Sequence, residues 1–357
     1  MSKTCLVTGG AGFIGCALSS RLPQYFDRVV AMDNMHPQVH QTPDRPADLD
    51  ERVEFVIGDV TKPEDWDAVL ADITPTHIIH LAAETGTGQS LREATRHADV
   101  NVVGTTQMLD ALVRHDKLPE KIVLTSSRAV YGEGKWIDAD GVESYPGQRS
   151  RQMLESKTWD FPGLTATPFN SAKVEPRPTS VYGSTKLAQE HILKSWCLSM
   201  DVTPVIYRLQ NVYGPGQSLI NPYTGIVSLF AQKAKAGEVI PVYEDGEIIR
   251  DFVFIDDVAD SLVLGTLNSG ANENAYDIGS GEATSILDLA KIAASVYGAP
   301  EPQINGMFRD GDVRAASCTI DDSKAALSWE PKVMVDEGLR TLCRWIDTGK
   351  RDERPLS

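Results

Sequence analysis

The sequence predicts an α/β protein whose larger part is a doubly wound parallel sheet, joined to a smaller lobe of mixed helix and short strand. Three observations predict it. Short apolar runs alternate with helical patterns, glycines follow the first run directly, and a long stretch rich in glycine and proline separates the fifth run from the next helix. Alternating strands and helices favour a parallel sheet, because each crossover helix returns the chain to the same edge.

The expected strands of the larger part come early in the chain. Five runs precede residue 128, namely TCLVT, RVVAMDN, VEFVIGDV, THIIHLAAE and KIVLTSS, with a helix expected over residues 13–22. A later strand is expected in VTPVIYRLQ, and DFVFIDDVADSLVLGTLN predicts a strand followed by a helix. We therefore expect residues 1–210 and 251–279 to form a Rossmann-type dinucleotide-binding domain, and residues 211–250 and 280–357 to form the smaller substrate-binding lobe.

Composition excludes several functional classes. The net charge of −16 over 357 residues disfavours nucleic acid or an anionic membrane as partner, because both attract basic surfaces. The chain has no signal-peptide pattern and no apolar run of membrane-spanning length, so we expect a cytoplasmic protein. The five cysteines stand at unrelated spacings, which predicts neither a metal site nor a disulfide framework.

The glycine string at residues 9–15 indicates a dinucleotide site. Glycine permits a tight turn and a close approach of the backbone to a pyrophosphate, and the amides that begin the next helix are free to bind phosphate. The position of the string between a strand and a helix strengthens the prediction. The expected cofactor contacts in it are Gly9, Gly12, Phe13, Ile14 and Gly15.

Asp33 ends the second expected strand. A carboxylate there would accept hydrogen bonds from the adenosine ribose and repel a 2′-phosphate, which predicts NAD rather than NADP; the alternative is an aspartate that only begins a turn. Ligands of doubly wound sheets bind at the carboxyl ends of strands. On this ground, further cofactor contacts are expected at Asp59, Val60, Leu81, Ala82 and Ala83.

Tyr182 and Lys186 are the candidate catalytic pair. They are four residues apart in a helical pattern, so both side chains project from one face of the helix. A cation held there favours the tyrosinate, and we expect it to lower the tyrosine pKa toward neutrality. Ser127 ends a strand about fifty residues earlier, where its hydroxyl can hydrogen-bond the reacting oxygen.

At these residues the chain resembles the extended short-chain dehydrogenases/reductases, specifically their nucleotide-sugar epimerase and dehydratase branch. The resemblance spans nearly the whole chain. It is carried by TGGAGFIG (8–15), GD (58–59), HLAA (80–83), NVVGT (101–105), Ser127 with Tyr182 and Lys186, RLQNVYGPG (208–216), RDFVFIDDVAD (250–260) and RDGDVR (309–314).

The resemblance implies roles for individual residues. Tyr182 would be the acid/base and Ser127 its hydrogen-bonding partner. Lys186 would bind the nicotinamide ribose and tune the pKa of Tyr182. Tyr182 and Lys186 would both contact the cofactor. Asn101 would be a further cofactor contact. The implied substrate contacts are Glu84, Thr85, Asn211, Arg250 and Arg309, the last three on the nucleotide diphosphate. Surface solvation is the alternative for the two arginines.

Two positions depart from the branch. Sugar dehydratases carry an Asp-Glu pair where this chain has Arg128 and Ala129, so the acid and base that expel water are missing and dehydration is not expected. Asp310 replaces a proline common in relatives, and a carboxylate beside Arg309 puts its phosphate-binding role in doubt.

The implied activity is NAD-dependent 4-epimerisation of a nucleotide sugar through transient oxidation to a 4-keto sugar. The segments 82–90 and 211–226 and the insertion are most similar to those of epimerases of dTDP-L-rhamnose and dTDP-6-deoxy-L-talose. Three alternatives stay open: an epimerase of UDP- or GDP-hexoses, an oxidoreductase that consumes NAD, and a non-catalytic NAD-binding scaffold. The last is disfavoured because both Tyr182 and Lys186 are present.

Two further expectations concern assembly and the insertion. Residues 99–115 and 182–200 carry apolar stripes, and the resemblance implies that they pair in a homodimer through a four-helix bundle; the alternative is that they only face their own sheet. The insertion at residues 133–180 is expected over the sugar pocket, because it leaves the strand of Ser127 and returns at Tyr182; a surface excursion is the alternative. Its aromatic residues Trp136, Tyr145, Trp159 and Phe169 would shape the pocket wall.

Overall fold

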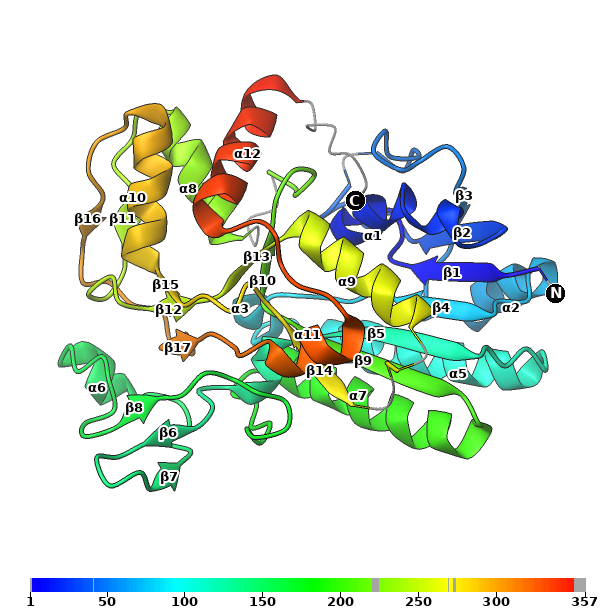
Figure 1. Ribbon diagram of the computed structural model, residues 1–357, viewed down its shortest axis with the longest axis horizontal. Coiled ribbons are helices and arrows are strands. Elements are labelled where there is room, and N and C mark those ends of the chain that lie inside the picture. Colours follow the sequence, from blue (N-terminus) through cyan, green and yellow to red (C-terminus); the bar gives the residue numbers. More distant parts are fainter. Residues whose placement is uncertain (1, 41, 220–224, 269, 272–273, 350–357) are drawn as a thin grey trace.

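The computed structural model describes residues 2–40, 42–219, 225–268, 270–271 and 274–349 (Figure 1). Residues 220–224 of the segment compared above, and the last residues of the expected smaller lobe, 350–357, lie outside this range. No helix within the described residues is long and apolar enough to cross a lipid bilayer.

A seven-stranded parallel sheet forms the centre of the larger domain. Its spatial order is β14-β9-β5-β4-β1-β2-β3, and every pairing in it is parallel. The strands are β1 (Thr4–Thr8), β2 (Arg28–Asp33), β3 (Glu54–Ile57), β4 (His77–His80), β5 (Lys121–Ser127), β9 (Thr203–Leu209) and β14 (Ala275–Ile278). The chain reverses direction across the sheet between β1 and β4, and the carboxyl ends of these strands flank a crevice. The predicted fold class is confirmed.

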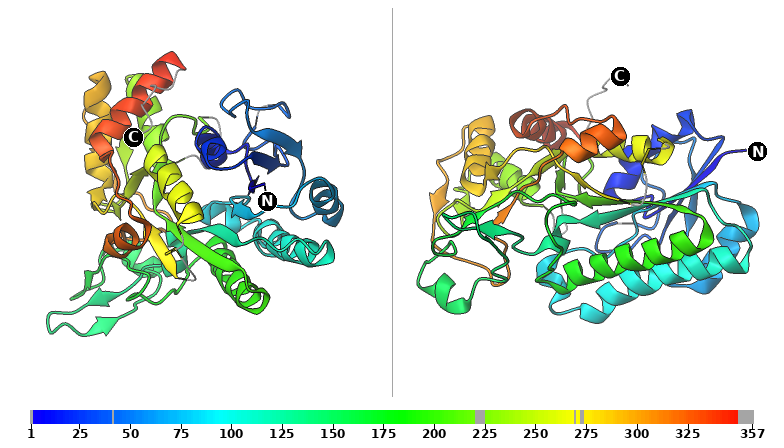
Figure 2. Two further views of the ribbon diagram at one scale, coloured as in Figure 1. Left: turned by 45° about the vertical axis from the view of Figure 1, so that its right-hand side comes forward. Right: turned by 60° about the horizontal axis from the view of Figure 1, so that its bottom comes forward.

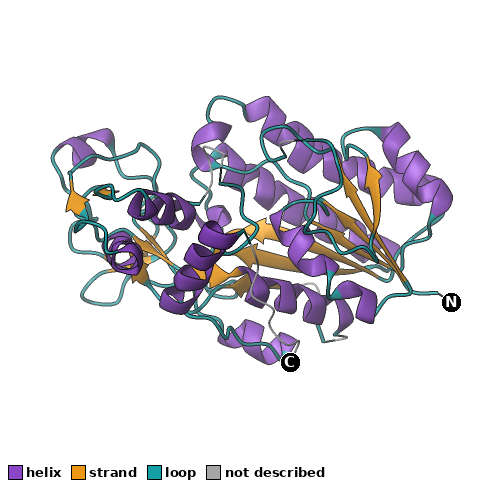
Figure 3. Cartoon of the chain, turned by 90° about the horizontal axis from the view of Figure 1, so that it is seen from above, coloured by secondary structure: helices purple, strands orange, loops and turns teal. Residues whose placement is uncertain are grey.

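Helices cover both faces of this sheet (Figure 3). One face packs against α1 (Phe13–Ser19), α9 (Ile255–Leu267) and α11 (Asp321–Leu327), and the other against α2 (Pro63–Asp72), α5 (Gly104–Arg114) and α7 (Val181–Met200). Because both faces are covered, the strands are apolar runs rather than alternating ones; all five residues of β1 are buried.

Two expected helices differ at their ends. The first stops at Ser19 and is followed by a 3-10 turn, η1 (Leu22–Gln24). The helix expected over residues 99–115 starts earlier and is built in three parts, α4 (Ala94–Ala98), a π-helical turn η2 (Asp99–Val103), and α5. Beside them, α3 (Thr87–Ser90) precedes α4, and α5 runs next to α7 (Figure 2).

The smaller lobe carries α8 (Ile226–Lys235), α10 (Ile286–Tyr297) and α12 (Val335–Thr348). Its short strands are β10 (Asn211–Tyr213) with β13 (Phe252–Phe254), β11 (Pro241–Val242) with β16 (Gln303–Ile304), and β12 (Ile249–Arg250) between β15 (Thr284–Ser285) and β17 (Ala315–Ala316). One hydrophobic core runs from the β1 face of the sheet into these helices, so the lobes share buried surface. The expected boundary differs at α11, which packs on β14: Ser323 Oγ donates to the Asp277 carbonyl oxygen at 2.7 Å.

The insertion forms an antiparallel sheet of β6 (Trp136–Ile137), β7 (Glu143–Ser144) and β8 (Thr165–Ala166), with the helix α6 (Arg151–Glu155). It lies beneath the smaller lobe in Figure 1 and is fastened to it. The Phe169 amide donates to the Ser317 carbonyl oxygen at 2.7 Å, and the Thr319 amide donates to the Phe169 carbonyl oxygen at 2.9 Å.

Buried charges fasten the insertion as well. The Arg149 guanidinium donates to both carboxylate oxygens of Glu244, at 2.8 and 2.9 Å. Arg314 joins Asp160 of the insertion to Asp245 of the lobe, at 2.7 Å on each side. The insertion therefore packs on the smaller lobe through these contacts, and it also packs on the larger domain, where the Ser171 hydroxyl donates to the Ala275 carbonyl oxygen at 2.6 Å.

Candidate active site

The glycine loop after β1 approaches the turn after β4 closely. Gly9 has φ +66°, and a Cβ added to it would lie 2.7 Å from the Ala82 backbone nitrogen. At Gly15, a Cβ would lie 2.4 Å from the Gly10 carbonyl oxygen. Gly15 thus serves the packing of α1 against its own loop, while Gly9 allows the loop to approach the turn after β4, which a side chain there would prevent.

Asp33 lies at the carboxyl end of β2, beside this loop. Its Oδ2 accepts a hydrogen bond from the Ala11 amide at 3.1 Å and its Oδ1 accepts one from the Met35 amide at 2.9 Å. His40 Nε2 lies 3.7 Å from Oδ1. The carboxylate is therefore held in place by backbone donors and faces the crevice, as a ribose-binding group must.

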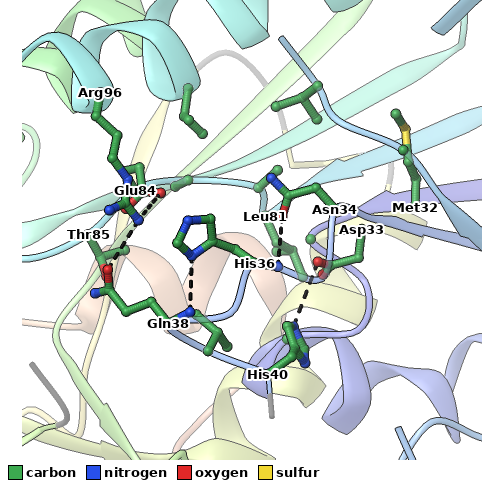
Figure 4. Close-up of a pocket in the computed structure, with 18 residues that line it drawn as sticks. Met32, Asp33, Asn34, His36, Gln38, His40, Leu81, Glu84, Thr85 and Arg96 are labelled. Atoms are coloured by element: carbon green, nitrogen blue, oxygen red, sulfur yellow. Dashed lines mark hydrogen bonds and ion pairs between the residues drawn. The ribbon is translucent and has the colours of Figure 1, made fainter. Parts of the chain in front are cut away.

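One cavity collects half of the predicted cofactor residues, together with two predicted substrate contacts (Figure 4). Its lining includes Gly9, Gly12, Asp33, Val60, Leu81, Ala82, Ala83, Glu84 and Thr85. An adjoining cavity shares Gly9 and Gly12 with it, adds Phe13 and Ile14, and extends to Gly216 and Trp345 of the smaller lobe. Together the two form an elongated space along the carboxyl edge of the sheet.

The predicted catalytic residues come together on β5 and α7, and none of them is among the residues that line either cavity. Ser180 caps α7 by accepting a hydrogen bond from the Gly183 amide at 3.0 Å, which places Tyr182 in the first turn and Lys186 one turn later. A Cβ at Gly183 would lie 2.4 Å from the Ala129 carbonyl oxygen, so α7 touches the residues after β5. The hydroxyl of Ser127 hydrogen-bonds the Tyr182 phenol.

The pKa values of the pair differ from the expectation. Burial raises the pKa of Tyr182, and the Ser127 hydrogen bond and the charge of Arg128 lower it by less. Burial lowers the pKa of Lys186 to about 7, against the opposing charge of Glu190. The predicted lowering of the Tyr182 pKa is wrong in this structure, because desolvation outweighs the neighbouring cation, which is Arg128 rather than Lys186.

A buried hydrogen-bond network around Glu190 fixes the position of α7, the helix of Tyr182 and Lys186. Glu190, one turn after Lys186, accepts hydrogen bonds from the Ser126 hydroxyl at 2.5 Å and from Arg208 at 2.7 and 3.0 Å. Arg208 also donates to the Tyr131 hydroxyl at 3.0 Å, and that hydroxyl donates to the Asp277 carboxylate at 2.9 Å. The network ties α7 to β5, β9, β14 and the 3-10 turn η3 (Arg128–Tyr131).

Cationic and amide groups extend the site toward the smaller lobe. Arg128 Nε donates to Asn211 Oδ1 at 2.8 Å. Arg250 is buried, and burial lowers its pKa; burial and the charge of Arg250 lower the pKa of Arg128. Arg309, by contrast, is exposed, with its guanidinium 5.0 Å from the centre of the Tyr243 ring.

The chain was compared with known families and proteins. Residues 5–279 match the model of the NAD dependent epimerase/dehydratase family. The chain belongs to this family. A curated member, dTDP-L-rhamnose 4-epimerase of Burkholderia thailandensis, is 59% identical over 344 residues, covering 96% of this chain and 95% of the relative. UDP-glucose 4-epimerase of Mycolicibacterium smegmatis is 29% identical over 341 residues, covering 94% and 95%.

Solved structures of the epimerase/dehydratase family share the fold. UDP-glucose 4-epimerase of Thermotoga maritima, solved with UDP-glucose, superposes with a TM-score of 0.80 at 27% identity, covering 97% of this chain and 99% of that one. UDP-glucose 4-epimerase of Thermus thermophilus, solved with NAD, gives a TM-score of 0.76 at 27% identity, covering 97% and 100%. The predicted family, NAD as cofactor, and the class of nucleotide-sugar 4-epimerases are confirmed.

Some epimerase/dehydratase family positions are placed differently from the expectation. The Asn101 side chain is buried, and its amide binds the backbone of Glu84 at 2.9 and 3.0 Å and the Thr185 hydroxyl at 3.0 Å. It therefore shapes the turn after β4 and has no donor left for the cofactor. The Asp59 carboxylate accepts hydrogen bonds from Thr61 and Asn34 and caps a local turn.

The expected substrate contacts are divided between two places. Glu84 and Thr85 line the cavity of Asp33 rather than the arginine cluster, and Glu84 pairs with Arg96 at 2.7 Å. Asn211 lies with Arg128. Asp310 pairs with Arg151 of the insertion at 2.7 Å, so it does not neutralise Arg309.

Among the residues of the Asp33 cavity that sequence reasoning missed are His36, Gln38, His40 and Arg96 (Figure 4). Gln38 accepts a hydrogen bond from Arg96 at 3.1 Å and exchanges hydrogen bonds with Gln89. The signal for the first three was their position in the loop directly after Asp33, at a strand end. For Arg96 no local signal exists, because it reaches the cavity from α4.

The aromatic residues of the insertion are also placed differently. Trp136 and Phe169 are 2% and 1% exposed, with Trp136 against Phe161 and Phe169 stacked on Tyr131 at 4.5 Å. They are core residues, and their expected role as a pocket wall is wrong. Tyr145 packs under Arg177, and Trp159 lies near Phe308, 6.4 Å between ring centres.

Proposed function

We propose that the protein interconverts dTDP-L-rhamnose and dTDP-6-deoxy-L-talose by inverting carbon 4. The observation that supports this substrate is the 59% identity, over nearly the full length of both chains, to a dTDP-L-rhamnose 4-epimerase. The site supports the chemistry, with a tyrosine, a serine and a lysine at the carboxyl edge of the sheet and a cluster of arginines and asparagine beyond them.

The residues divide the work in a simple way. The Tyr182 oxygen takes the proton of the sugar hydroxyl and later returns it, while the Ser127 hydroxyl holds the reacting oxygen. Bound NAD would accept the hydride from carbon 4 and give it back to the opposite face of the keto sugar. Gly9, Gly12 and the Asp33 carboxylate fit its pyrophosphate and ribose, and Lys186 would hold its second ribose. Arg250 and Asn211 would hold the diphosphate while the sugar turns over.

The test is a panel of dTDP-, UDP- and GDP-sugars mixed with purified protein, with NMR of the sugar and absorbance of NADH as readouts. We expect inversion of dTDP-L-rhamnose without net NADH. Conversion of UDP-glucose alone would refute dTDP-L-rhamnose as the substrate. UDP-glucose is in the panel because UDP-glucose 4-epimerases have a similar fold. Stoichiometric NADH formation would refute the epimerase.

We also propose a homodimer formed by α5 and α7. Both helices lie on the outer side of the larger domain (Figure 2), and Val113 of α5 and Leu198 of α7 are 48% and 65% exposed. Val103, which precedes α5, is also exposed. Pairing of two such faces would form a four-helix bundle. Light scattering should give twice the monomer mass, and Leu198→Glu should give the monomer.

A further inference from the structure

Arg128 belongs to a cluster of hydrogen-bond donors at the start of η3. A guanidinium can only donate, so the Asn211 atom 2.8 Å from Arg128 Nε must be the amide oxygen. The Asn211 amide group is therefore turned so that its two N–H bonds point away from Arg128. Within the described residues, no acceptor is found for them or for the two terminal nitrogens of Arg128.

Arg250 adds a second cation to the cluster; it is buried, whereas Arg128 is half-buried. One of its terminal nitrogens donates to the Ile249 carbonyl oxygen at 2.7 Å. Neither Arg128 nor Arg250 forms an ion pair within the part of the chain that the structure describes, and Asp312 and Glu133 act on both only at longer range. The buried arginines 149, 208 and 314 differ, because each has a carboxylate at 2.7 to 2.8 Å.

A buried cation and a half-buried one of like charge, neither of them in an ion pair, are costly unless an anion joins them. Burial and the charge of Arg250 lower the pKa of Arg128 to about 9. A diphosphate would remove this cost, since it brings two negative groups and only acceptor oxygens, the complement of the donors present.

The position of Arg128 selects one of the two phosphates. It directly follows Ser127, and its charge acts on Tyr182, so it stands at the catalytic end of the cluster. The sugar must reach Ser127 and Tyr182, and the phosphate attached to the sugar is the β-phosphate. We propose that Arg128 binds this sugar-linked phosphate and turns the Asn211 amide toward the diphosphate, which makes it a substrate-binding residue specific to nucleoside diphosphates. The inference rests on the proposed function for the class of ligand.

Calorimetric titration of the NAD-loaded protein with dTDP and with dTMP tests it. Arg128→Ala should weaken dTDP about 10- to 100-fold, the range for losing a charge-assisted bidentate contact, and should weaken dTMP less than about 3-fold. Arg128→Lys, which keeps the charge without the fork, should lose less than Arg128→Ala. Arg128→Met keeps the aliphatic stem, so it should match Arg128→Ala if the guanidinium is responsible. Arg340→Ala, which removes an exposed arginine of α12, is the matched control and should leave both affinities unchanged.

Bound NAD, measured by absorbance after extraction, should be equal in all variants. Affinity of Arg128→Ala and Arg128→Met for dTDP within twofold of the parent, or equal losses for dTDP and dTMP, would overturn the inference. The titration requires no turnover. A protein that inverts no sugar at carbon 4 but binds dTDP through Arg128 would therefore refute the proposed function and support the role of Arg128.

Discussion

Arg208 on β9 belongs to the buried network next to the proposed catalytic residues, and its replacement by methionine should be strongly destabilising. The guanidinium binds both oxygens of Glu190 at 2.7 and 3.0 Å, binds the Tyr131 hydroxyl at 3.0 Å, and lies 4.8 Å from the centre of the Tyr131 ring. Arg208 and Glu190 are only 6% and 3% exposed, so water does not replace what the substitution removes.

The magnitude follows from the charge that is left behind. Removing one member of a buried ion pair costs about 3 to 5 kcal/mol, because its partner stays buried and uncompensated. Arg208→Met keeps most of the buried volume, so little of this loss comes from a cavity. Glu190→Gln should cost less, since the amide oxygen can still accept from Arg208 and from the Ser126 hydroxyl.

Urea denaturation followed by tryptophan fluorescence measures the free energy of unfolding of each variant. In the double variant Arg208→Met with Glu190→Gln, neither charge remains, so the loss should be smaller than the sum of the single losses by at least about 1 kcal/mol. Arg340→Ala again serves as control and should change stability by less than about 0.5 kcal/mol. A loss below about 1 kcal/mol for Arg208→Met, or strictly additive losses in the double variant, would refute the assignment of a coupled buried pair.

Three further predictions concern the cofactor, the base and a buried acid. Tyr182→Phe should lower turnover about 100- to 10,000-fold, with NAD content unchanged, and full activity would remove Tyr182 from the mechanism. Asp33→Ala should weaken NAD about 10- to 100-fold in a fluorescence titration and relax discrimination against NADP; an unchanged preference would make Asp33 a turn residue. Burial raises the pKa of Asp277 to about 7. A carboxyl group whose pKa is raised in the folded state stabilises the folded protein fully only below its unfolded pKa, and this contribution is lost as pH rises through the folded pKa. Asp277→Asn should therefore gain stability relative to the parent between pH 4 and 8, by up to about 4 kcal/mol, whereas a difference independent of pH would contradict the shift.

The larger domain and the cofactor edge could be predicted because their signals are local. Gly9 and Gly12 lie in the loop after β1 and Asp33 ends β2, and parallel strands bring their carboxyl ends to one edge whatever the rest of the chain does. Tyr182 and Lys186 share a helix, so their spacing alone places them on one face. These positions depend on a few neighbouring residues and on the topology of the sheet.

The remaining positions depend on contacts that no short window contains. The hydrogen-bonding groups of the Asn101 side chain are occupied by the backbone of Glu84 and by the Thr185 hydroxyl. The pKa of Tyr182 depends on how much water its surroundings exclude. Phe169 is buried because it pairs with Ser317 and stacks on Tyr131, and the two-residue strands of the insertion are too short to give a periodic pattern. In each case the partner lies far away in the sequence.

The fastening of the insertion to the smaller lobe constrains how this enzyme can be recombined. Arg149 and Glu133 belong to the insertion, but their partners belong to the smaller lobe. Arg149 is buried against Glu244, and Glu133 is buried against the backbone of Arg314. A chimera that took the lobe of a relative and kept this insertion would bury these charges against a surface not shaped for them, at a cost of several kcal/mol for each unpaired charge. The unit that can be exchanged is thus discontinuous in the chain, and new substrate preferences are to be sought in variants that replace the lobe and the insertion together.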